Sequence, residues 1–120
     1  MTSRPYTVIL RRRGKPEKHG CATLADAVDL LERELRADAT RARAHPRDEK
    51  GLGRTYTPEM QVVTRGELRG PGGLRVGIDV RGDGDAQAYT GRIRRQLIDV
   101  FPREDAYQAL RRMLIEEQAL

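Results

Sequence analysis

In residues 74–81, large apolar residues alternate strictly with residues that are charged or glycine, and this pattern constrains the fold more than any other part of the chain. Because successive side chains of a strand point to opposite sides, a period of two predicts a strand that is buried on one face only. The turn residues Gly70-Pro71-Gly72-Gly73 precede it, and a further apolar stretch lies within residues 59–69. These segments predict a β-hairpin. Its inward side chains are expected to be Leu74, Val76, Ile78 and Val80.

A helical pattern covers residues 23–39. Thr23 is followed three residues later by Asp26, the spacing of a capping box, in which each side chain satisfies a free backbone amide. The apolar residues that follow recur at intervals of four, three and four. This spacing predicts an amphipathic helix that needs a sheet or another helix against its apolar stripe, which consists of Leu24, Val28, Leu31 and Leu35.

The remaining segments carry weaker patterns. Residues 6–12 alternate like a strand, and residues 13–22, with their glycines and proline, are typical of a loop. Apolar residues within 86–100 recur at helical spacing, although Gly91 would weaken a helix there and a strand over 89–93 stays open as an alternative. Pro102 is expected to open a last helix.

These elements predict an α+β fold with a three-stranded mixed sheet in the order β-α-β-β-α-α. A helix between the first two strands favours a parallel pair with a right-handed crossover, and the third strand would then lie in the centre. The helices are expected on one face of a single domain, 1–120, in which residues 40–58 form a mobile connection. Three strands leave two edges and a partly exposed face, so a homodimer is predicted.

The charge of the chain is strongly biased towards arginine. The 23 cationic residues outnumber the 18 acidic ones, for a net charge of +5, and only Lys15, Lys18 and Lys50 are lysines. A GC-rich genome would explain the ratio of arginine to lysine, but not the positions of the arginines. Residues 1–20 hold six cations and one acid. Arginine and lysine at one end of a sheet predict a surface for phosphates, against the alternative of a solvated charged face.

The predicted topology places the loop after the first strand beside the turn of the hairpin. The expected polyanion-binding residues at this end of the sheet are Arg11, Arg12, Arg13, Lys15, Lys18 and Arg69. The aromatic residues are few and scattered, and the spacings of helix-turn-helix, zinc-finger and RNA-recognition motifs are absent from the sequence.

No set of residues predicts a catalytic or metal site. His19 and Cys21 lie close together in the sequence, but His45, the only other histidine, is expected at the opposite end of the sheet. The acidic residues around Gly84 fail the spacing of a calcium loop. No catalytic residue, metal or cofactor is therefore predicted, and an enzyme ranks behind two binding roles.

The first of these roles is a basic, homodimeric module that binds nucleic acid or another polyanion. The alternative is a protein-assembly or adaptor module that uses the sheet face or the C-terminal helix. The sequence contains no apolar run long enough to cross a membrane, and no secretion signal is predicted at its start. The single cysteine suits a reducing environment, so a cytoplasmic location is expected.

Overall fold

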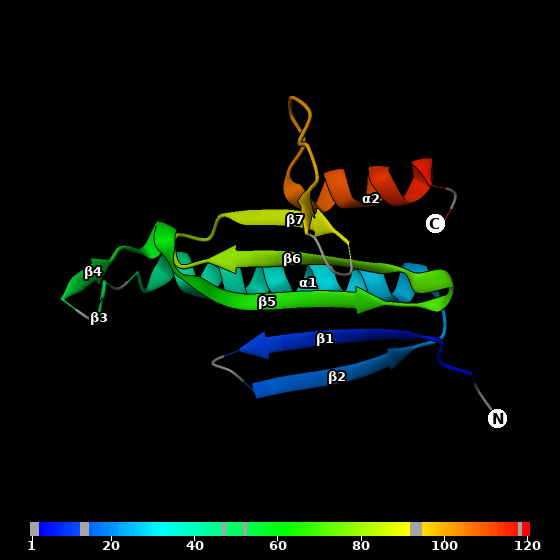
Figure 1. Ribbon diagram of the computed structural model, residues 1–120, viewed down its shortest axis with the longest axis horizontal. Coiled ribbons are helices and arrows are strands. Elements are labelled where there is room, and N and C mark those ends of the chain that lie inside the picture. Colours follow the sequence, from blue (N-terminus) through cyan, green and yellow to red (C-terminus); the bar gives the residue numbers. More distant parts are fainter. Residues whose placement is uncertain (1–2, 13–14, 47, 52, 92–94, 118) are drawn as a thin grey trace.

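Six strands form one antiparallel sheet in the order β2-β1-β5-β6-β7-β8 (Figure 1). The structure is a computed structural model, and it describes residues 3–12, 15–46, 48–51, 53–91, 95–117 and 119–120. The strands of this sheet are β1 (Tyr6–Arg12), β2 (Lys15–Cys21), β5 (Val62–Arg69), β6 (Arg75–Arg81), β7 (Ala86–Thr90) and β8 (Gln96–Leu97). The helices are α1 (Leu24–Ala44) and α2 (Ala106–Glu116), and a separate two-stranded ribbon consists of β3 (Glu49–Gly51) and β4 (Arg54–Tyr56).

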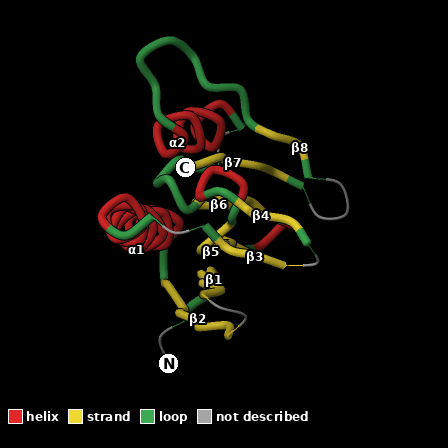
Figure 2. The backbone as a smooth tube through the Cα atoms, turned by 90° about the vertical axis from the view of Figure 1, so that its left-hand side faces the viewer, coloured by secondary structure: helices red, strands yellow, loops and turns green. Residues whose placement is uncertain are grey.

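Both helices pack on the same face of the sheet (Figure 2). The core lies between this face and the helices, and its buried strand residues are the inward half of each alternation, Val8, Leu10, Leu68, Val76, Ile78, Val80 and Ala88. Gly66 of β5 allows α1 to approach, because a Cβ atom there would lie 2.6 Å from Leu31 Cδ1 and 2.9 Å from Leu35 Cδ1. The predicted hairpin and the predicted first helix are both present, with Thr23 accepting a hydrogen bond from the Asp26 amide at 3.1 Å.

The α+β class is confirmed, but the three-stranded mixed sheet in the order β-α-β-β-α-α is wrong. The predicted loop over 13–22 contains β2, which pairs antiparallel with β1. This additional strand reverses the chain before α1, so β5 meets β1 antiparallel rather than parallel. β2 carries Lys15, Pro16, Glu17 and Lys18, a composition that is poor in strand formers but suits an exposed sheet edge.

The predicted helix over 86–100 is also wrong. Ala86–Thr90 forms β7 beside β6, and Gln96–Leu97 forms the short edge strand β8. Helical spacing misled here because Tyr89 and Leu97, eight residues apart, are cross-strand partners that lie on one face of the sheet. Gly91, with a positive φ of 114°, lies just after β7, where the chain leaves the strand.

Residues 40–58 include the end of α1 and the β3–β4 ribbon, which projects beyond the end of the sheet (Figure 1). The final helix begins at Ala106 rather than at Pro102, because Asp105 and Gln108 form a reciprocal capping box. Arg111 fastens this helix to α1 through Asp29 at 2.8 Å and Glu32 at 3.1 Å. Within the described ranges, neither helix combines the length and the apolar character needed to cross a lipid bilayer.

Candidate nucleic-acid interface

The face of the sheet opposite the two helices, here called the helix-free face, is rich in arginine. Strand register assigns its side chains, because cross-strand partners point to the same side. One row joins Arg11, Arg65 and Asp79, and the next joins Lys18, Ile9 and Glu67. Among the described residues, the cationic side chains on this face outnumber the carboxylates, which are Glu67 and Asp79. The cations are Arg11, Lys18, Arg65, Arg69, Arg75, Arg81 and Arg95.

Glu67 organises one half of the helix-free face. Its side chain is only 6% exposed, and three arginines from three strands surround it. Arg69 Nη2 lies 3.0 Å from Glu67 Oε2, Arg11 Nη1 lies 3.4 Å from Oε1, and Arg75 Nη2 lies 3.5 Å from Oε2. The side chains of the three arginines remain 30–43% exposed, so each of them still reaches the surface. One buried carboxylate therefore holds three cationic groups in place at the surface.

Asp79 holds two arginines in the other half of the helix-free face. Arg65 Nε lies 3.1 Å from Asp79 Oδ1, and Arg95 Nη1 lies 3.8 Å from Oδ2. The guanidinium of Arg95 also lies 4.7 Å from the centre of the Tyr89 ring, a cation–π distance. Arg65 is thus held by a carboxylate, and Arg95 by both a carboxylate and an aromatic ring.

The Tyr89 ring lies over Gly77, its neighbour on β6. A Cβ atom on Gly77 would lie 2.4 Å from both Cζ and Oη of Tyr89, so the ring occupies the space that a side chain would need. Tyr89 is 3% exposed, and its hydroxyl has no hydrogen-bond partner among the described residues. Burial, with the nearby charge of Asp79, raises the pKa of Tyr89 to about 12. The hydroxyl therefore stays neutral at physiological pH.

The Glu67 cluster predicts an acid-sensitive contribution to stability. Burial alone would raise the pKa of Glu67, but the hydrogen bond from Arg69 and the charges of Arg75 and Arg11 lower it below its ordinary value. The contribution of the carboxylate is therefore complete above its unfolded pKa of about 4.3, and it is lost as the pH falls through the lower folded value.

We expect Glu67→Gln to be less stable than the parent protein at pH 7, and the difference to shrink towards pH 3. Urea unfolding of both proteins at the two pH values measures it. A difference that stays constant with pH would show that the charge of Glu67 does not stabilise the fold.

The residues expected to bind polyanions divide between the two sides of the sheet. Arg11, Lys18 and Arg69 lie on the helix-free face. Lys15 pairs with Arg12 on the side that the helices cover. Arg13 lies outside the described residues. Alternation within β1 and β2 separates neighbours in the sequence, so only part of the expected set comes together.

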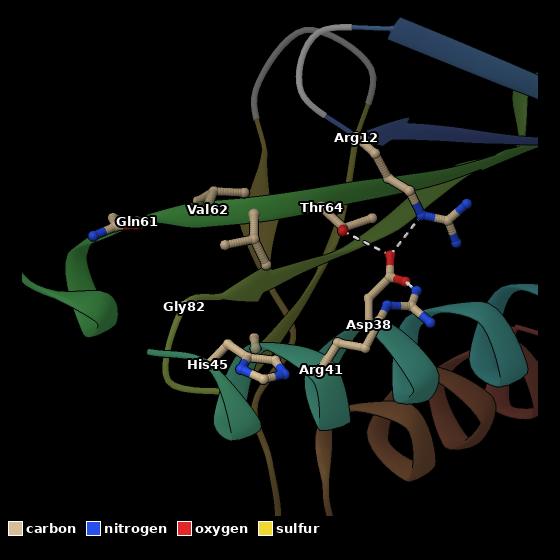
Figure 3. A pocket seen from close by; sticks show the side chains of 10 residues that line it. Arg12, Asp38, Arg41, His45, Gln61, Val62, Thr64 and Gly82 are labelled. Carbon is tan, nitrogen blue, oxygen red and sulfur yellow. Dashed lines mark hydrogen bonds and ion pairs between the residues drawn. The ribbon is translucent and has the colours of Figure 1, made fainter. Parts of the chain in front are cut away.

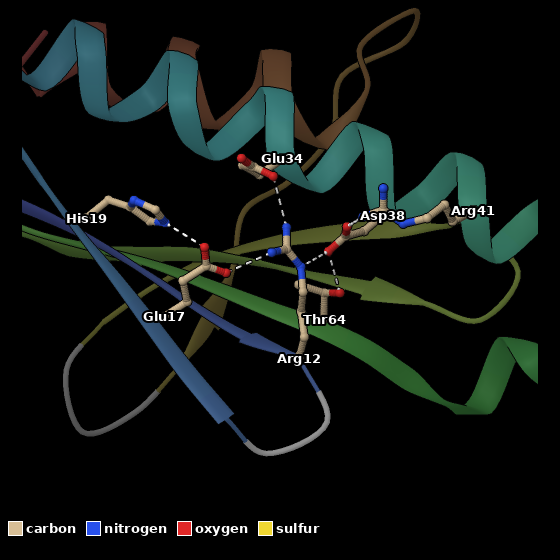
Figure 4. A network of polar contacts seen from close by, with 7 residues as sticks. All are labelled: Arg12, Glu17, His19, Glu34, Asp38, Arg41 and Thr64. Atoms are coloured by element: carbon tan, nitrogen blue, oxygen red, sulfur yellow. Dashed lines mark hydrogen bonds and ion pairs between the residues drawn. The ribbon is translucent and has the colours of Figure 1, made fainter.

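Arg12 belongs to a different network, between the sheet and α1 (Figure 4). Its guanidinium contacts Asp38 at 2.7 Å, Glu17 at 2.9 Å and Glu34 at 3.0 Å. Asp38 is buried and also accepts hydrogen bonds from Arg41 and, at 2.7 Å, from the Thr64 hydroxyl. The charge of Arg12 is therefore balanced by carboxylates, and its role here is to join β1 to the helix.

A cleft of about 820 Å³ lies beside this network, between the end of α1 and the start of β5 (Figure 3). Its wall combines Arg12, Asp38 and Arg41 with His45 and the partly apolar edge of Val62 and Val63. Asp38 pairs with both arginines, and Arg12 also pairs with Glu17 and Glu34. The cleft thus presents a neutralised polar wall, in contrast to the cationic excess of the helix-free face.

The expected set of polyanion-binding residues does not include several residues of the helix-free face, namely Arg65, Arg75, Arg95, Glu67 and Asp79. The outward positions of residues 74–81 were the available signal, since they place Arg75 and Asp79 on the face away from the core. The partners of those side chains on β5 could be identified only once the register of the hairpin was known.

His19 and Cys21 point to no catalytic pair. His19 Nε2 lies 3.1 Å from Glu17 Oε1, on the side of the sheet that faces α1. Burial and the nearby charge of Asp26 raise the pKa of Cys21 despite the opposing charge of Arg4, which disfavours the thiolate. Among the described side chains, no three of histidine, cysteine, aspartate or glutamate are grouped so as to hold a metal ion.

Comparison with known proteins adds no relative. No protein-family model, no curated protein and no solved structure matches the chain.

Proposed function

We propose that the chain is a non-catalytic module that binds nucleic acid through its phosphate backbone, with the helix-free face as the contact surface. The observation that carries the proposal is the arrangement of arginines around Glu67 and Asp79. Guanidinium groups suit phosphate because they present several donors in a rigid plane. Their fixation by the two carboxylates lowers the entropy that would be lost on binding.

This proposal retains Arg11, Lys18 and Arg69 from the expected site and adds Arg65 and Arg75. It assigns no phosphate contact to Arg12, whose guanidinium bonds to three carboxylates. A reducing compartment such as the cytoplasm is part of the proposal, because it would keep Cys21 as the free thiol seen here.

Lys18 and Lys15 offer a matched test of the face that binds. Both are exposed lysines of β2, but Lys18 pairs with Ile9 on the helix-free face, and Lys15 pairs with Arg12 on the other. We expect Lys18→Glu to weaken binding of a labelled 20-base-pair duplex roughly tenfold at 50 mM salt, and to lower the salt slope by about 0.9. Lys15→Glu should have a much smaller effect.

Fluorescence anisotropy across a salt series measures both variants and the parent protein. Equal losses for the two lysines would mean that the helix-free face is not the contact surface. Absence of any binding at low salt, where electrostatic attraction is strongest, would remove the proposal altogether.

Self-assembly into a homodimer is the second candidate function. The observation in its favour is that Ile115, an apolar residue, is 59% exposed. Ile115 lies in α2, the C-terminal helix that was expected as an alternative interface. Light scattering over a range of protein concentrations, in the same buffers, separates the two functions. A concentration-dependent dimer without duplex binding would favour assembly.

A further inference from the structure

We infer that the nucleic acid held on the helix-free face is double-stranded DNA, an inference that rests on the proposed function. Proteins that bind single strands stack successive bases on exposed aromatic rings. Tyr89 is the aromatic residue of this face in the described part of the chain, and it is 3% exposed. Gly77 lies under its ring, and the guanidinium of Arg95 lies 4.7 Å from the ring centre. The ring is therefore not available to a base.

The other described aromatic side chains do not replace it. Tyr6 packs against the core, and Tyr107 is buried there. Phe101 is half-exposed in the loop after β8, but Arg112 already lies 3.6 Å from the centre of its ring. Tyr56 lies on the projecting ribbon and is half-buried. The described surface thus offers cations for phosphates without a row of rings for bases.

The spread of the cations fits the dimensions of a duplex. Cationic side chains of the helix-free face come from four adjacent strands, from Lys18 on β2 to Arg75 on β6. Neighbouring strands lie about 4.8 Å apart, so these four strands span roughly 14 Å. The major groove of B-DNA is about 12 Å wide. The face can therefore meet phosphates on both sides of one groove, whereas a single strand needs only a narrow track.

The β3–β4 ribbon supplies an element that can enter that groove. It projects beyond the end of the sheet (Figure 1) and is displaced towards the side away from the helices (Figure 2). The major groove of B-DNA admits a two-stranded ribbon, whereas the major groove of an RNA duplex is deep and narrow. The combination of a ribbon and a flat cationic face indicates a DNA duplex.

The experiment compares one labelled 20-base-pair DNA duplex, its two separated strands and the RNA duplex of the same sequence. Anisotropy at 50 and 150 mM salt should show the DNA duplex bound at least about tenfold more tightly than either single strand. A single strand bound as tightly as the duplex, or more tightly, would overturn the inference and leave the proposed function standing. An RNA duplex bound as tightly as the DNA duplex would overturn the assignment to DNA. No binding to any probe would overturn the proposed function itself.

Thr55 tests the part played by the ribbon. It is exposed on β4, and Thr55→Glu should weaken binding of the DNA duplex several-fold by adding a negative charge to the groove-entering element. Thr40→Glu is the matched control, since Thr40 is exposed on α1, on the other side of the sheet. Equal affinities of the two variants would remove the ribbon from the interface and overturn the groove-entry model.

Discussion

Asp38→Ala is expected to lower the free energy of unfolding by about 2 kcal/mol, because it removes a hydrogen bond to a charged group and leaves a buried hydroxyl unsatisfied. The carboxylate is 5% exposed and accepts hydrogen bonds at 2.7 Å from both Arg12 and Thr64. Its removal leaves the buried Thr64 hydroxyl without an acceptor. Arg12 retains Glu17 and Glu34 and is 31% exposed, so it does not become an isolated buried charge.

Urea unfolding at pH 7 measures this loss, with Glu34→Ala as the control. Glu34 contacts the same guanidinium at 3.0 Å, but its side chain is 33% exposed, so its removal should cost less than about 1 kcal/mol. If the two variants were equally stable, burial of Asp38 would not be what makes the network important.

Gly77→Ala is expected to destabilise the protein by about 3 kcal/mol, the upper end of the usual cost of overpacking. The added Cβ would lie 2.4 Å from the Tyr89 ring and 2.6 Å from the backbone oxygen of Gly66. The ring could rotate away only by leaving its place on the sheet, and the Gly66 oxygen belongs to the paired strand β5. The clash can therefore be relieved only by moving the Tyr89 ring or the backbone of β5, and either movement costs stability.

Gly20→Ala provides the comparison, because Gly20 also lies in a strand. There the nearest atoms to the added Cβ belong to the flexible side chain of Arg4, the closest at 3.2 Å, so the change should be close to neutral. Thermal unfolding followed by circular dichroism distinguishes the two. A Gly77→Ala protein as stable as the Gly20→Ala protein would contradict the close packing of Tyr89 on β6.

The elements that the sequence predicted well are those whose periodicity comes from the core. α1 and the β5–β6 hairpin each bury one side against many apolar neighbours, so apolar residues recur in their sequences at the spacing of a helix or a strand. β2 is mostly exposed, so its sequence contains no alternation of apolar and polar residues that would predict a strand. β7 presents the small inward residues Ala86 and Ala88, which are compatible with either a helix or a strand.

The candidate site was predicted in part for the same reason. Arg11, Lys18 and Arg69 could be identified as cations near one end of the sheet, but which of them share a face depends on the β1–β2 and β1–β5 registers. The missed strand β2 is what separates Lys15 from Lys18. The role of Glu67 depends on side chains from three strands, and local sequence does not contain that information.

The alternation of β6 has a consequence for how the chain avoids misfolding. A slip of one residue against β5 would turn Arg75, Asp79 and Arg81 into the core and expose Val76, Ile78 and Val80 to water. Burial of unpaired charge is so unfavourable that the shifted pairing cannot compete with the native one. Arg75, which is proposed to contact DNA, thus also acts with Asp79 and Arg81 against wrong strand alignments, and neutralising all three at once is expected to make shifted pairing more frequent even where the native fold stays stable.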